Sequence, residues 1–314
     1  MPWLSRSNDL TDVVAMCLCG FSALFWLLTM IPSSKARIGT VRTHNDGYKL
    51  LHAPRYRPET VRGVIIVTCI HRVEMLWEDG RRKLAWMCIR KLLARYPSEA
   101  VLSVTEGHFL AEQGDYAQAA ASYERWLDAG IVSEPARQQV VAQRFSALAR
   151  ANKPGEARRC AEEALRAVSP EYRGGQLDAL ATEVIKCELR AFLPEADAWS
   201  QEALAQATEA ITLKGTRGSV LVELGRSAEG EALLRQVWDI SGSEVDAAIS
   251  AFYLGVVANR SGCHRDAARW LRRSKGFAPS VGKWLLDRIA KESYDDPAKQ
   301  QISSQSIDLP KPAA

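Results

Sequence analysis

A pattern of small and aromatic residues that returns every 34 to 39 residues is the strongest constraint on the fold. Its clearest copy is SEAVLSVTEGHFLAEQGDYAQAAASYERWLDAG, at residues 98–130. Gly114-Asp115-Tyr116 separates two stretches of helical periodicity there, because glycine and aspartate favour turns. Gly107 and Ala119 leave room for two helices to cross closely. The segment therefore predicts two antiparallel helices joined by a short turn.

Five copies begin near residues 100, 138, 177, 211 and 248. In the last copy the matching residues are Leu254, Gly255, Gly262, Ala267 and Leu271. The three middle copies are weaker and rest on Ala157, Ala161 and Ala164, then Ala196, Ser200 and Ala203, then Gly218, Gly225, Leu234 and Val237. At least about three such units are needed to bury a continuous core. An all-α solenoid at 99–293 follows, with a capping helix at 280–292 and a disordered tail at 294–314.

This pattern resembles the tetratricopeptide repeat, in which a unit of about 34 residues carries small residues near positions 8 and 20. The resemblance implies a scaffold that binds a protein or peptide partner in a concave groove lined by the first helix of each repeat. The groove candidates are Val104, His108, Ala142, Ser146, Asp178, Glu188, Ser219, Val222, Phe252 and Asn259. The Lys and Asn pattern by which some members bind a peptide carboxylate is not present.

The N-terminal segment 13–31, VVAMCLCGFSALFWLLTMI, is apolar and uncharged. At about 1.5 Å per residue, such a helix would be close to the thickness of the hydrocarbon core. We therefore expect a single transmembrane helix, with residues 1–12 outside the cytoplasm. A cleaved signal peptide and a buried core helix are the alternatives, but the basic n-region that a signal peptide needs is nearly absent.

The linker at 32–59 is basic and predicts the orientation of this helix. Residues 32–62 carry seven Lys or Arg and two Asp or Glu, whereas Arg6 is the one basic side chain before the helix. Positively charged segments that flank a transmembrane helix are retained in the cytoplasm. We therefore expect a single-pass membrane protein whose C-terminal domain is cytoplasmic. A helical hairpin is expected at 60–98, with Gly80 between its two helices.

A second, shorter resemblance covers residues 13–52. Pro32, then Asp46-Gly47, then Leu50-Leu51 follow the apolar run. This order is similar to the C-terminal end of the site-2 protease family of intramembrane zinc metallopeptidases. The resemblance implies that Asp46 is a zinc ligand and that zinc is the cofactor. The HExxH helix that supplies the other ligands and the base in that family is absent, so a truncated or split fragment is the alternative function.

Composition and motifs narrow the functional classes to which this protein could belong. The net charge of +4 is too small to predict a nucleic-acid partner. Seven cysteines without a CxxC pair favour free thiols rather than a disulfide framework. No phosphate-binding loop, GxSxG or HExxH motif occurs. The sequence therefore predicts a membrane-anchored interaction scaffold without cofactor, catalytic residue or enzymatic activity of its own, and zinc enters only under the protease-like alternative.

Overall fold

The computed structural model describes residues 37–38, 41–42, 58–97, 99–129, 133–278 and 281–294. The chain divides into two compact units, residues 1–88 and 89–314. The predicted membrane helix, most of the linker and the predicted tail lie outside the described residues. Within the described residues, no helix combines the length and the apolar character that crossing a bilayer requires.

The first unit contains a short strand pair and one long helix. Strands β1 (Arg37–Ile38) and β2 (Val41–Arg42) pair antiparallel within the predicted linker, where no strand was expected. Helix α3 (Pro58–Glu78) follows. Gly80, at φ +77°, separates it from α4 (Arg82–Arg95), which crosses the boundary between the units. Two helices flanking Gly80 were predicted here.

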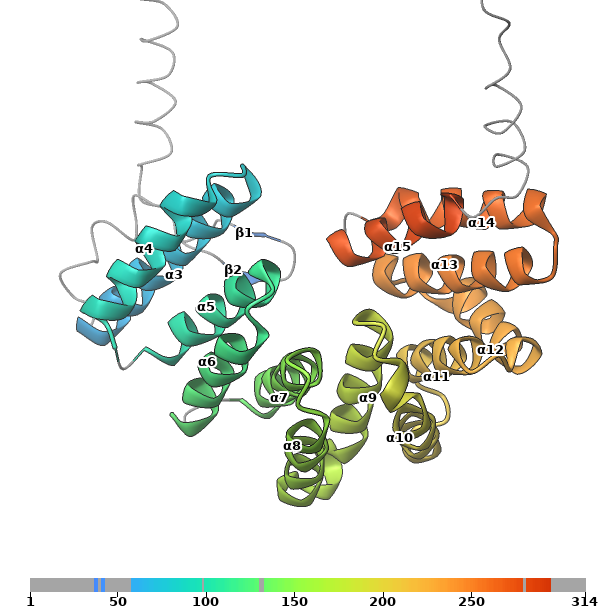
Figure 1. Cartoon of the computed structure of the whole chain (residues 1–314), viewed down its shortest axis with the longest axis horizontal. Helices are drawn as coiled ribbons and strands as arrows, with labels where there is room; N and C mark the ends of the chain where they lie inside the picture. Colours follow the sequence, from blue (N-terminus) through green and yellow to red (C-terminus); the bar gives the residue numbers. More distant parts are fainter. Residues whose placement is uncertain are drawn as a thin grey trace, which may run out of the picture. The chain divides into compact units, whose positions relative to one another are not determined.

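The second unit is a series of helical hairpins that follow one another along the chain (Figure 1). Its elements are α5 (Ala100–Gln113), α6 (Tyr116–Asp128), α7 (Glu134–Arg150), α8 (Pro154–Ala167), α9 (Pro170–Lys186), η2 (Arg190–Phe192), α10 (Leu193–Gln206), α11 (Ile211–Glu223), α12 (Ser227–Ile240), α13 (Glu244–Arg260), α14 (His264–Phe277) and α15 (Lys283–Tyr294). Each first helix packs on its own second helix, and neighbouring hairpins pack on each other. The predicted all-α solenoid of helical hairpins is confirmed.

The turn inside each hairpin has one left-handed residue in the same place. These residues are Gly114, Asn152, Glu188, Gly225 and Gly262, with φ between 52° and 85°. The amide of the next residue donates to a carbonyl five positions back, which satisfies a helix-end acceptor. Each such residue lies 14 positions after its predicted repeat start, except in the third repeat, where the interval is 11.

The predicted start of that third repeat was therefore three residues too late. The three-residue 3-10 helix η2 is inserted between Glu188 and α10. It shifts Ala196 to eight positions after the left-handed residue, whereas the equivalent Ala119 lies five after its own. Counting back from Ala196 with an ordinary turn thus misplaces the start.

Small residues occur where the paired helices cross. A Cβ on Gly107 would lie 2.5 Å from the ring of Tyr123, and one on Gly255 would lie 2.9 Å from the side chain of Leu271. Ala119 and Ala267 occupy buried positions on the second helices. The close crossing inferred from the sequence is therefore present.

Candidate functional site

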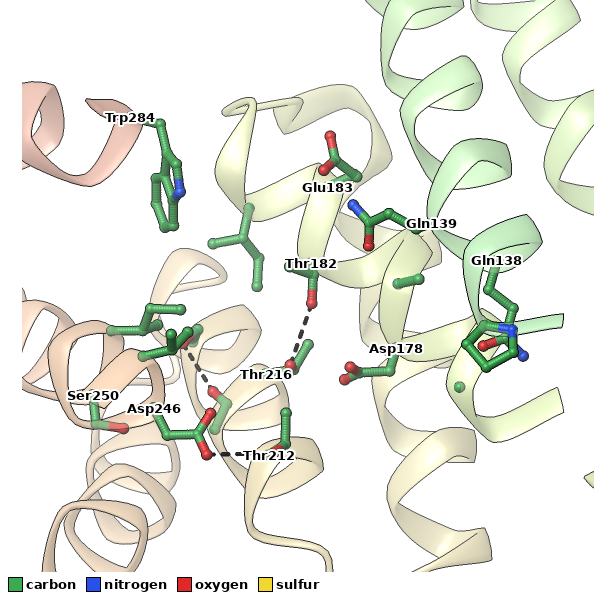
Figure 2. A pocket seen from close by; sticks show the side chains of 18 residues that line it. Gln138, Gln139, Asp178, Thr182, Glu183, Thr212, Thr216, Asp246, Ser250 and Trp284 are labelled. Atoms are coloured by element: carbon green, nitrogen blue, oxygen red, sulfur yellow. Dashed lines mark hydrogen bonds between the residues drawn. The ribbon is translucent and has the colours of Figure 1, made fainter. Parts of the chain in front are cut away.

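The first helices α7, α9, α11 and α13 contact one another in sequence and form one continuous face, here called the first-helix face. A cavity of about 330 Å³ opens in it, and Trp284 of α15 contributes to its lining (Figure 2). Its 18 lining residues comprise small, hydroxyl, amide and carboxylate side chains and a few aliphatic ones. This volume lies at the lower end of the range of about 300–1,000 Å³ typical of ligand pockets.

Asp178 of α9 is the most unusual group in this cavity. Its Oδ1 atom is buried and has no hydrogen-bond partner. Burial raises the pKa of Asp178 to about 6; a hydrogen bond from Thr216 opposes this shift, and the negative charge of Asp246 adds to it. Asp178 lines the cavity, and a buried carboxylate oxygen without a partner is costly, which marks the carboxyl group as one that a cationic ligand could stabilise.

Asp246 of α13 lies across α11 from Asp178 (Figure 2). Its carboxylate accepts hydrogen bonds from Thr212, at 3.3 Å, and from Ser241, at 3.2 Å. The hydroxyls of Thr182 and Thr216, which also line the cavity, are 3.4 Å apart. The cavity lining therefore includes carboxylates and hydroxyls from three helices, α9, α11 and α13.

Glu183 is the third acidic residue of the cavity, and its charge is compensated. Lys186 donates to Glu183 Oε1 at 2.9 Å, and the thiol of Cys187 lies 3.5 Å from Oε2. Burial raises the pKa of the Cys187 thiol to about 11, so this cysteine is a poor nucleophile. No nucleophile and base pair is evident among the residues of this cavity.

Arg288 of α15 forms hydrogen bonds to residues of three first helices, α9, α11 and α13. Its guanidinium donates to Tyr253 Oη at 2.7 Å, to the carbonyl of Ile185 at 3.2 Å and to Glu223 Oε1 at 2.5 Å. Lys291 adds an ion pair to Glu188 at 2.9 Å. These contacts, with α15 packing on α13 and α14, hold Trp284 at the cavity.

The structure places the predicted groove residues in different surroundings. Asp178 and Ser219 line the cavity, and Glu188 lines a smaller cleft beside Arg288. Of the others, Ser146 is buried and donates to the Gln143 carbonyl, and Phe252 belongs to the core. His108 and Asn259 form side-chain hydrogen bonds, with Gln143 and His264 respectively, each at 3.0 Å. Ala142 and Val222 are buried in the core, and Val104 is half-buried.

Residues that sequence reasoning did not select complete the cavity. Asp246 follows Ser243, whose hydroxyl caps α13, so it reads as a helix-terminus residue. Trp284 was expected only as an apolar residue of the capping helix. Asp246 and Trp284 line the cavity because α13 and α15 pack beside the other helices. The repeat pattern of the sequence does not predict these contacts between helices.

The proposed zinc ligand Asp46 lies outside the described residues. Within the described residues, no group of three His, Cys, Asp or Glu side chains is arranged to hold a metal ion. The structure thus adds no support for the protease-like alternative.

Paired helices, a repeated left-handed turn and a continuous first-helix face define a helical-repeat protein. The sequence matches the tetratricopeptide repeat family model over residues 101–213 and 202–274, more than half of the chain. The chain belongs to the tetratricopeptide repeat family. No curated protein matched in a sequence comparison.

Three solved structures resemble this chain at low sequence identity. A tetratricopeptide repeat protein from Parabacteroides merdae is 14% identical, with a TM-score of 0.52, over 71% of this chain and 83% of that one. PilW, described as a type IV pilus biogenesis factor, is 12% identical, with a TM-score of 0.44, over 71% and 97%. PilF of Pseudomonas aeruginosa is 15% identical, with a TM-score of 0.41, over 72% and 96%.

Proposed function

We propose that this protein is an interaction scaffold whose first-helix face binds a peptide segment of a partner protein. The cavity of about 330 Å³ carries the proposal, since residues from α7, α9, α11, α13 and α15 converge on it. A cavity that size admits one or two side chains but not a folded domain. The hydroxyl, amide and carboxylate groups around it suit hydrogen bonding to an extended peptide.

Site-specific photo-cross-linking tests this proposal in cells. A photoreactive amino acid at Ala179, which lines the cavity, is expected to cross-link to a partner protein. The same amino acid at Ala232, exposed on the second helix α12, is the matched control and is expected to give no such product. Equal products from both positions, or products from Ala232 alone, would contradict binding at the first-helix face.

We also propose that residues 13–31 tether the scaffold to a membrane, with the repeats in the cytoplasm. The uncharged run of 19 residues and the basic linker after it support this. Full-length protein should stay in the membrane fraction after carbonate extraction, and a chain without residues 1–31 should not. Protease should reach the repeats in inverted vesicles only. Extraction of the full chain by carbonate, or digestion in right-side-out vesicles, would contradict the tether or its orientation.

A further inference from the structure

The charge of the cavity is one-sided, and this bears on the chemistry of the partner. Three lining residues are acidic, and none of the 18 is Lys, Arg or His. Lys186 compensates Glu183. Within the described residues, Asp178 and Asp246 form no ion pair. Two carboxylates without an ion-pair partner thus line the same cavity, one on α9 and one on α13.

The geometry around these carboxylates suits a long cationic side chain. Asp178 Oδ1 is buried without a partner, and Ser250 Oγ, also at the cavity, is buried without one. Trp284 supplies an aromatic ring at one end (Figure 2). A carboxylate and an aromatic face together favour an organic cation, since the first forms charge-assisted hydrogen bonds and the second attracts positive charge.

Other classes of ligand suit this cavity less well. An anion would be repelled by both carboxylates, and a purely apolar group would offer the Asp178 carboxylate no partner. The described residues offer no set of three metal-ligating side chains in one place, which disfavours a metal ion. A cation carried by a flexible stem remains, because its apolar stem can lie along Ala179 and Ile249 while its head reaches Asp178.

We propose that the cavity receives a lysine or arginine side chain of the bound partner, held between Asp178, Asp246 and Trp284. This inference rests on the proposed function, because it names the chemistry of the segment that the first-helix face binds. The cationic head pairs with the Asp178 carboxylate, and the Trp284 indole lines the same cavity.

Peptide selection with the full chain in detergent micelles tests the proposal. A random dodecapeptide phage library is the probe, and we expect the enriched peptides to share a Lys or Arg. Asp178→Asn should weaken the best peptide about tenfold or more, because a charge-assisted hydrogen bond is lost. Asp239→Asn, on the exposed side of α12, is the matched control and should change nothing.

A second measurement changes the peptide instead, so its main comparison, on the unmodified protein, does not depend on how a variant folds. Replacing the shared Lys or Arg of the best peptide by norleucine should weaken binding to the unmodified protein about tenfold, and have little further effect on Asp178→Asn. No enriched peptide, a shared acidic or apolar residue, or unchanged affinity after norleucine replacement would overturn the inference. If Ala179 still cross-links to a partner, the proposed function survives that result; if it does not, both fail.

Discussion

Replacing Arg288 with methionine is expected to lower the free energy of unfolding by about 2–3 kcal/mol and to release α15. The Arg288 and Glu223 side chains are only 11% and 17% exposed, so the change leaves a largely buried carboxylate without its main partner. Losing one member of a fully buried pair costs about 3–5 kcal/mol. We expect less because Tyr253 still donates to Glu223 and because Arg260 lies 3.8 Å from it.

Urea unfolding of the full chain measures this effect, and hydrogen exchange of α15 locates it. Arg272→Met, on the exposed side of α14, is the matched control and should change stability by less than about 0.5 kcal/mol. The double variant Arg288→Met with Glu223→Gln should recover part of the loss, because the unpaired charge is removed. Equal effects of Arg288→Met and Arg272→Met would show that Arg288 does not fasten α15.

Gly230→Ala is expected to destabilise the fourth hairpin by about 2 kcal/mol. A Cβ there would lie 2.7 Å from both the carbonyl oxygen of Gly218 and the Cγ2 atom of Val222. The backbone of α11 cannot move aside without disturbing its contacts with α9 and α13, and overpacking of this kind costs about 1–3 kcal/mol. Thermal unfolding followed by circular dichroism measures the change.

Gly276→Ala is the matched control, because it adds the same methyl group to a helix without a clash. Gly276 is exposed on α14, and no atom lies within 4 Å of its added Cβ. The free energy of unfolding of the Gly276→Ala variant should rise by up to about 1 kcal/mol, since alanine is the better helix former. A neutral Gly230→Ala would mean that α11 and α12 do not cross as closely as described.

The helices and turns were largely predictable because each repeat carries its own local signals. Glycine marks the turn at Gly114, Gly225 and Gly262, where a left-handed backbone is needed. Asn152 and Glu188 take the same conformation without glycine, and they belong to two of the three repeats that were weaker in the sequence. The η2 insertion carried no signal of its own, so it displaced the predicted start of the third repeat.

The site was only partly predictable, because it depends on contacts between repeats. Repeat position pointed to Asp178 and Ser219, which line the cavity. It also pointed to Phe252, which α15 covers: the guanidinium of Arg288 lies 4.9 Å from the centre of its ring. Helix α15, which follows the last repeat, thus affects which residues of the first helices stay accessible. The periodicity of the repeats does not predict its position.

Hydrogen–deuterium exchange of the full chain, with and without the partner that cross-links at Ala179, tests most directly whether the first-helix face is the binding surface. Binding there should slow exchange in α9, α11 and α13, whose residues line the cavity, and leave α8 and α12 unchanged. Slower exchange confined to α8, α10 and α12 would place the partner on the second helices and contradict the account.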